Sequence, residues 1–255
     1  MFDSHAHYDD EKFNIDRDTL LEQIFLDKNH IINASVNKKT TESSILLAEK
    51  YKNMFFAAGV HPEFAQAETD FETWLLPAIN HKKCVAIGEI GLDYFYDQPS
   101  KEHQKSAFYR QLDLALKKNM PVVIHDREAH ADCVAAILAR KGLKGVFHSF
   151  SGSAETAKIL QNVGFYISFS GVISFKNAAK SKEACLAVSD ERLLVETDCP
   201  YLAPTPFRGK RNDTNFIKYT IQAIADVRGT SFDYIEKITT QNAENLFGLS
   251  QKRGY

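Results

Sequence analysis

Short apolar runs alternate with longer stretches of helical periodicity along most of the chain. These apolar, β-branched runs occupy residues 1–5, 31–35, 54–60, 85–90, 122–125, 145–148, 166–170 and 193–197. Each run is four to seven residues long, a length typical of buried parallel strands.

Helical patterns fill the intervals between these runs. Residues 100–118 place Phe108, Leu112 and Ala115 on one face and end in a Lys-Lys-Asn sequence that suits a helix terminus. Further helices are predicted over residues 153–163, 215–227 and 232–247. Eight strands alternating with helices predict a parallel α/β fold, and the count of eight favours a closed (β/α)₈ barrel of the TIM type over an open sheet.

Length and composition agree with one globular barrel. The chain has 255 residues, and a (β/α)₈ barrel takes about 250 residues as a single domain, so one domain over residues 1–255 is expected. Hydrophobic residues make up 44% and charged residues 25%, which is ordinary globular composition. The longest apolar stretches are far shorter than the ~20 residues that a bilayer requires, so no membrane span is expected.

Net charge and cysteine content limit the partners and the cellular compartment that can be expected. The formal net charge is −2, which argues against non-specific adhesion to nucleic acid but leaves a metal-assisted nucleic-acid substrate open. The four cysteines are widely spaced and form no CxxC motif, so they predict reduced thiols rather than disulfides or a zinc clip. The first residues show no secretion signal, and a cytoplasmic protein is expected.

Polar residues gather where the predicted strands end. A His or a carboxylate follows or closes six of the eight strands: His5 and His7, His61, Glu89, His125, His148, and Glu196 with Asp198. In a barrel all of these ends meet at one face, which is where such folds carry their chemistry.

Each residue has an ordinary structural explanation when taken alone. A His-x-His pair can lie on a surface, a single His after an apolar run is more often a hydrogen-bonded core residue, and Asp198 could cap a turn. Glu89 is harder to explain in this way, because its surroundings are too apolar for an unpaired charge.

Taken together, four imidazoles and two carboxylates predict a divalent metal site, most simply with two metals. His5, His7 and Asp198 would bind one ion and His125 and His148 the other. Glu89 would bridge two ions about 3.5–4 Å apart. Because this ligand set accepts magnesium, manganese, zinc, cobalt or nickel, the metal stays open.

Other residues give weaker signals for substrate contact. Arg127 would share the face of His125 if its strand continues, and the Arg208–Arg211 loop carries guanidinium groups that suit phosphate. His61 could contact substrate or simply end a strand. Tyr201 and the Tyr94-Phe95-Tyr96 run could stack on bases, although packing in a loop is the commoner fate of aromatic residues.

With these residues in place, the chain resembles the TatD-type metal-dependent deoxyribonucleases, a branch of the amidohydrolase-like metallohydrolases. The matching pieces are Asp3-Ser4-His5-Ala6-His7, Gly59-Val60-His61-Pro62, Gly88-Glu89-Ile90-Gly91-Leu92-Asp93-Tyr94, Ile124-His125-Asp126-Arg127, Phe147-His148-Ser149-Phe150-Ser151-Gly152, Glu196-Thr197-Asp198-Cys199-Pro200-Tyr201-Leu202 and Arg208-Gly209-Lys210-Arg211-Asn212. They occur in family order, and residues 239–243 also resemble the family's ending. One departure is Asp213-Thr214, where the family often has an acidic residue followed by proline.

The resemblance implies a TIM-type barrel with a dinuclear site. His5, His7, Glu89 and Asp198 would bind the first metal, and His125 and His148 would bind the second with Glu89 shared. His61, Arg127, Tyr201 and Arg208 would lie near the scissile phosphate.

The implied activity is hydrolysis of DNA, often from 3′ ends, by a metal-activated water. Glu196 could orient a water or accept a proton, beside Glu89 and Asp198 as catalytic carboxylates. The expected partner is DNA, single-stranded or at its 3′ ends, and a monomer is expected because a barrel closes without a partner.

Two alternatives remain open from the residues alone. The same metals could hydrolyse a carbonyl ester or amide, in a small metabolite or an aminoacyl-tRNA. A non-catalytic metal- or nucleic-acid-binding barrel is the other alternative, but it would be expected to have lost a ligand position, and none is lost here.

Overall fold

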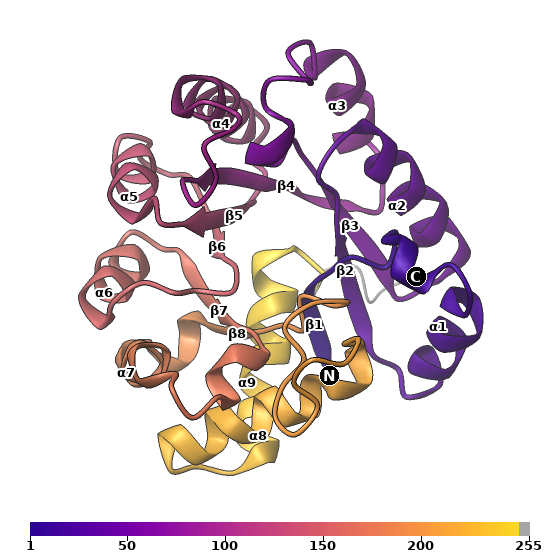
Figure 1. The fold of residues 1–255 in the computed structure, drawn as a ribbon, viewed down its shortest axis with the longest axis vertical. Helices are drawn as coiled ribbons and strands as arrows, with labels where there is room; N and C mark the ends of the chain where they lie inside the picture. The colour runs from indigo at the N-terminus through magenta and orange to yellow at the C-terminus, as the bar shows by residue number, and fades with distance from the viewer. Residues whose placement is uncertain (250–255) are drawn as a thin grey trace.

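Eight parallel strands form a barrel surrounded by helices (Figure 1). A computed structural model of the chain describes residues 1–249. The strands are β1 (Phe2–Ala6), β2 (His30–Ala34), β3 (Met54–Ala58), β4 (Cys84–Asp93), β5 (Val122–Arg127), β6 (Gly145–Phe147), β7 (Tyr166–Phe169) and β8 (Leu193–Val195). They are paired in sequence order from β1 to β8, so the predicted (β/α)₈ barrel is confirmed.

The helices form the outer ring, and their positions follow the chain around the barrel (Figure 1). They are α1 (Arg17–Leu26), α2 (Lys38–Lys50), α3 (Glu72–Ile79), α4 (Lys101–Lys118), α5 (His130–Leu138), α6 (Ala154–Asn162), α7 (Ala179–Ala187), α8 (Ile217–Arg228) and α9 (Phe232–Leu246). The four helices predicted from periodicity are all present. The single domain over residues 1–255 stays a prediction, and its residues 250–255 lie outside the described part of the chain.

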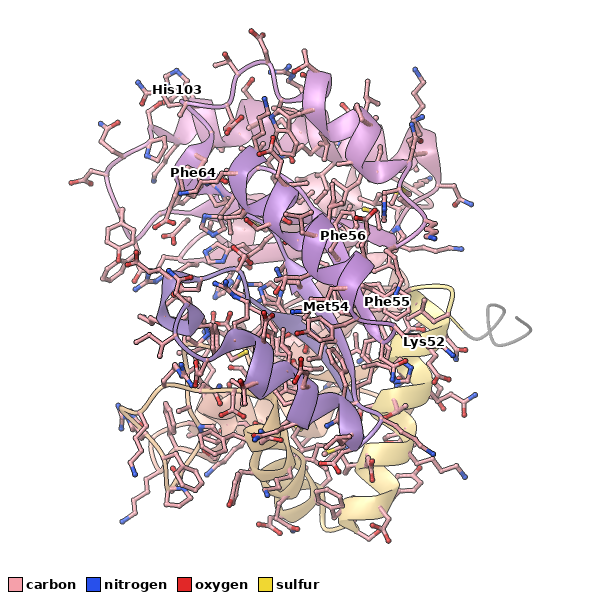
Figure 2. The ribbon with its side chains drawn as sticks, turned by 90° about the vertical axis from the view of Figure 1, so that its right-hand side faces the viewer. Lys52, Met54, Phe55, Phe56, Phe64 and His103 are labelled. Atoms are coloured by element: carbon pink, nitrogen blue, oxygen red, sulfur yellow. The ribbon has the colours of Figure 1, made fainter. Side chains whose placement is uncertain are left out.

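The barrel interior is filled by one apolar side chain or two from every strand, including Phe2, Ile32, Val123 and Leu194. The end of α9 packs on this interior cluster through Ala243 and Phe247. In the side view of Figure 2, α9 lies at the same end as Lys52 and Phe55, near the start of β3, whereas Phe64 lies at the other end. Closing the N-terminal end in this way leaves the C-terminal end of the barrel open for chemistry.

Several strands differ in length from the predicted runs, and the differences at β4 and β8 affect the site. β4 continues to Asp93, three residues beyond the predicted 85–90 run, and it pairs with β5 through Asp93 and Arg127. Gly91 permits this extension, because its φ is +152° and a Cβ there would lie 1.9 Å from the carbonyl oxygen of His125. β8 is shorter than predicted and ends at Val195, so Glu196 and Asp198 lie in the segment after the strand.

Side chains help to close the seam between β8 and β1. The backbone joins β1 to the segment after β8 through an isolated bridge between Ala6 and Cys199. The Asp198 N–H donates to the His5 carbonyl oxygen beside this bridge. The fully buried Asp3 carboxylate accepts the backbone N–H of Thr197 at 2.9 Å and its hydroxyl at 2.6 Å. These bonds fix the residue just before Asp198 to β1, which carries His5 and leads directly to His7.

Thr214 extends this buried network. Its hydroxyl donates to Asp3 Oδ2 at 2.7 Å, its backbone N–H donates to the Tyr8 hydroxyl, and Tyr8 donates back to Thr214 Oγ1. Burial raises the pKa of Asp3 to about 7, against the lowering effect of the Thr197 and Thr214 bonds. Proline has no N–H, so the threonine at position 214 gives this seam a backbone donor that a proline would lack.

Candidate metal centre

A cavity of about 1370 Å³ opens at the C-terminal ends of the strands. Most of its lining comes from the C-terminal parts of the strands, from the segments that follow them and from α2. It includes eight of the predicted site residues: His7, His61, Glu89, His125, Arg127, His148, Asp198 and Tyr201. His5 is fully buried next to them.

Glu89 occupies the centre of this cluster. It lies on β4, where every residue is buried, and its own side chain is 4% exposed. One carboxylate oxygen, Oε2, faces His5 and His7, and the other, Oε1, faces His125 and His148. The two oxygens therefore divide the cluster into two halves.

The first half joins β1 to the segment after β8. His5 Nε2 lies 3.3 Å from Glu89 Oε2 and 3.7 Å from Asp198 Oδ1. His7 Nε2 lies 3.6 Å and 3.3 Å from the same two oxygens, and the two imidazole Nε2 atoms are 3.1 Å apart. Two nitrogens and two carboxylate oxygens thus converge on one point.

The second half joins β5 to the segment after β6. His125 Nδ1 lies 2.8 Å from Glu89 Oε1, His148 Nε2 lies 2.9 Å from it, and the two nitrogens are 3.2 Å apart. The rings of His5 and His148 stack at 4.0 Å, so the two halves are in direct contact.

Hydrogen bonds on the far side of three rings determine which nitrogen carries the proton. His7 Nδ1 lies 2.8 Å from the Ala34 carbonyl oxygen, and His148 Nδ1 lies 3.2 Å from Glu196 Oε1. His125 Nε2 lies 3.2 Å from Asp93 Oδ2. Since each of these outer partners is an acceptor, the neutral ring donates outward and presents a lone pair to the cluster, as a metal ligand must.

His61 is oriented the opposite way. The backbone N–H of Glu63 donates to His61 Nδ1 at 3.3 Å, at the start of the η2 turn (Pro62–Phe64). The Glu63 carboxylate lies 3.5 Å from the same nitrogen but is half-exposed. A ring that accepts at Nδ1 carries its proton on Nε2, which faces Glu89 Oε1 at 3.5 Å. His61 therefore presents a donor to the cavity.

The donor set fits divalent metal ions. Ligand atoms about 2.0–2.2 Å from an ion in tetrahedral or octahedral geometry lie about 3.0–3.5 Å from one another. The nitrogen–oxygen and nitrogen–nitrogen distances in the two halves span 2.8–3.7 Å. Three groups of side chains bring their ligand atoms within 4.8 Å of one another: His5, His148 and Asp198; His5, His7 and Glu89; and His61, Glu89 and His125. The last group includes His61, whose inward proton sets it apart from the other rings.

The cluster is electrostatically coupled. Burial would raise the pKa of Glu89, but His148, His5 and His61 outweigh it and hold that pKa well below its usual range. Burial opposes charge on His7, yet Asp198 and Glu89 raise its pKa to about 9. Burial and the neighbouring His125 lower the pKa of His61 to about 3, which agrees with a neutral ring.

The other residues predicted to contact substrate lie outside the ligand cluster. Arg127 and Tyr201 line the cavity, and the Tyr201 hydroxyl donates to Asp10 at 2.6 Å. Arg208 is exposed, stacks on Phe175 at 4.6 Å and does not line the cavity, so its contact with substrate stays a prediction.

Glu196 lies behind His148 rather than in the cavity. It is fully buried and also accepts the backbone N–H of Ser149 at 2.7 Å. Its predicted position beside Asp198 rested on strand alternation, which stops where β8 ends at Val195.

Asp93 is a site residue to which the sequence assigned no role. Its Oδ2 faces His125, and its Oδ1 accepts the backbone N–H of Phe95 at 2.9 Å. The sequence does contain a sign of this role, because Asp93 is a second carboxylate four residues after Glu89 in the same apolar run. Recognising it required knowing that β4 continues that far.

A closed parallel barrel with buried imidazoles and carboxylates at its C-terminal mouth defines the class of barrel metallohydrolases. Comparison with known proteins agrees. The chain belongs to the TatD-related DNase family, whose model matches residues 2–248. It is a metal-dependent hydrolase of that family, so the resemblance seen in the sequence is confirmed.

Individual relatives cover nearly the whole chain. An uncharacterized metal-dependent hydrolase, YabD, from Bacillus subtilis is 39% identical over 98% of this chain and 100% of its own. The 3'-5' ssDNA/RNA exonuclease TatD of Escherichia fergusonii is 30% identical over 98% of this chain and 100% of its own. The crystal structure of YjjV, a TatD homolog from Escherichia coli K12, matches with a TM-score of 0.91 and 28% identity over 97% of this chain and 98% of that one.

Proposed function

We propose that this protein is a deoxyribonuclease that hydrolyses phosphodiester bonds of single-stranded DNA with two divalent metal ions. The observation that carries the proposal is the division of the cluster by Glu89, with one carboxylate oxygen facing each half. A relative named for 3'-5' exonuclease activity on single-stranded DNA and RNA supports the choice of substrate.

The ligand sets follow from the two halves. His5, His7 and Asp198 would hold one ion with Glu89 Oε2, and His125 and His148 would hold the other with Glu89 Oε1. When bound, two divalent ions supply positive charge to a phosphoryl group and make an attacking water easier to deprotonate. The donor set accepts magnesium, manganese, zinc, cobalt or nickel.

Buried neighbours keep the ligands in position. Asp93 and Glu196 fix the rings of His125 and His148 through their outer nitrogens, in the carboxylate–histidine arrangement common around metal sites. Glu196 would thus act on the reaction through His148, whereas the sequence predicted that it orients a water or accepts a proton.

His61 and Arg127 would act on the substrate itself. The inward Nε2–H of His61 is placed to donate to a phosphoryl oxygen, and a neutral donor held in advance stabilises charge as it develops there. Arg127, at the rim, would add a fixed positive charge.

The size of the cavity favours a polymeric substrate over a small metabolite. Its volume exceeds the roughly 300–1,000 Å³ usual for small-molecule sites. Its lining holds eight carboxylates but only three lysines and arginines: Asp9, Asp10, Glu11, Glu63, Glu89, Asp93, Asp126 and Asp198 against Arg17, Lys39 and Arg127. Bound cations would therefore be needed to attract a phosphodiester.

The test is a cleavage assay on single-stranded DNA labelled at the 3′ or the 5′ end, with each divalent ion in turn, beside a panel of esters, amides and lactones. The proposal expects metal-dependent cleavage of DNA and a loss of nearly all turnover in Glu89→Ala. Carbonyl hydrolysis without DNA cleavage would overturn the substrate assignment. Near wild-type cleavage by Glu89→Ala would overturn the role of Glu89.

A further inference from the structure

Two neighbouring aromatic side chains have large exposed surfaces, and one of them, Tyr96, lines the cavity. Phe95 and Tyr96, in the segment between β4 and α4, are each 50% exposed. The preceding residue, Tyr94, packs against the hydrophobic core and donates its hydroxyl to Asp132 at 2.6 Å. Core packing therefore accounts for Tyr94 but leaves the two following rings turned outward.

The rings and Arg127 form one unit. The rings of Phe95 and Tyr96 lie 4.9 Å apart and nearly perpendicular, at 89°. The Arg127 guanidinium lies 3.8 Å from the centre of the Phe95 ring and 5.3 Å from that of Tyr96. Arg127 and Tyr96 both line the cavity. We call Phe95, Tyr96 and Arg127 the rim platform.

Buried hydrogen bonds hold the segment that carries the platform. Gln104, 2% exposed, accepts the backbone N–H of Asp93 and donates to the carbonyl oxygens of Asp93 and Pro99, at the two ends of the segment. Half-exposed aromatic rings on a segment tied at both ends are held ready for a flat ligand, which lowers the entropic cost of binding.

Asp93 links the platform to the metal centre. One carboxylate oxygen accepts the backbone N–H of Phe95 and the other faces His125 Nε2. Arg127 Nη1 lies 3.9 Å from the same oxygen that faces His125. The platform therefore has a fixed position beside the half of the cluster that contains His125 and His148.

We propose that the rim platform binds a nucleobase of the substrate, next to the phosphodiester that is cut. This inference rests on the proposed function. Bases stack on aromatic faces without regard to sequence, and an arginine whose face is stacked keeps its N–H edge free for the adjoining phosphate. The platform would thus fix the substrate by one base and one phosphate, and it would accept any of the four bases.

The test compares single-stranded oligonucleotides that each carry one abasic residue, at the last, second-last or third-last position from the 3′ end. A fully abasic oligomer is included. With wild-type protein, removing the base at one of these positions is expected to lower kcat/KM about tenfold, the scale of one base–aromatic stack. The Phe95→Ala/Tyr96→Ala double variant is expected to lose about tenfold on normal DNA. On the oligonucleotide that lacks the base whose removal slows wild-type protein, and on the fully abasic oligomer, the double variant should have the same kcat/KM as wild type.

Matched variants separate stacking from structural damage. Phe95→Trp, which keeps an aromatic face, is expected to stay near wild type on normal DNA, whereas Phe95→Leu should lose activity. Tyr234→Ala removes a half-exposed aromatic ring on α9, outside the cavity, and should leave kcat/KM for single-stranded DNA unchanged. Metal content should be the same in all of these variants.

The outcomes are distinguishable. Cleavage of DNA that is equally fast with and without each base, or a double variant as active as wild type on normal DNA, would overturn the platform and leave the nuclease proposal standing. No cleavage of any oligonucleotide by wild-type protein would overturn the proposed function and the platform with it.

Discussion

At the scale of single residues, the position of one proton separates His61 from the other imidazoles of the cluster. His7, His125 and His148 each face an acceptor on the outer side, whereas His61 faces the backbone N–H of Glu63. When neutral, the first three rings present lone pairs suited to a metal, and His61 presents an N–H suited to a substrate oxygen.

This difference predicts how His61 variants behave. His61→Ala should lower kcat/KM for single-stranded DNA about a hundredfold, the scale of losing one donor to developing charge, while metal content stays unchanged. His61→Gln places an amide N–H near the position of Nε2 and should recover part of the loss. Loss of bound metal from purified His61→Ala would show instead that His61 is a ligand.

The sequence could predict the convergence of the ligands but not these protons. His5, His7, Glu89, His125, His148 and Asp198 meet because parallel strands bring their C-terminal ends together, which follows from the strand pattern alone. The inward proton of His61 depends on a turn after β3, and the partners of Asp93 depend on where β4 ends. Neither feature has a periodic signature.

At the scale of elements, the seam between β8 and β1 depends on side chains. Strand pattern predicted both strands but not the network of Asp3, Tyr8, Thr197 and Thr214 that joins them. In the sequence, Asp3 stands two residues before His5, and the strand pattern assigns it no role. In the structure it is turned into the wall of the barrel.

Thr214→Val should therefore weaken the seam. The substitution leaves a buried Asp3 oxygen and the Tyr8 hydroxyl without one partner each, so the free energy of unfolding should fall by about 1–3 kcal/mol. Urea denaturation of the metal-free protein measures this change. Thr69→Val, at an exposed position, is the matched control, and an equally small effect in both variants would contradict the role of the seam.

At the scale of the whole molecule, the acidic cavity and the small net charge make bound cations central to function. Within residues 1–249, every helix is too short or too polar to span a bilayer. Composition alone suggested weak attraction for nucleic acid. The cavity agrees with this, because its lining holds more carboxylates than lysines and arginines.

Metal affinity should rise with pH. In the metal-free protein the pKa of His7 is raised to about 9, and Glu89 and Glu196 overcome burial to raise that of His148 well above its usual value. Both rings therefore hold a proton at neutral pH, and each must release it to bind a cation. Titration of metal-free protein with zinc or manganese against a chelator should give tighter binding at each step from pH 6 to about pH 9. An affinity independent of pH over that range would contradict the assignment of these rings.

The most direct test of the account is anomalous diffraction from crystals grown with manganese or zinc. The account predicts two peaks about 3.5–4 Å apart, one beside each carboxylate oxygen of Glu89. His5, His7 and Asp198 would surround the first peak, and His125 and His148 the second. A map with no ion density shared among these side chains, or with a single ion away from Glu89, would contradict it.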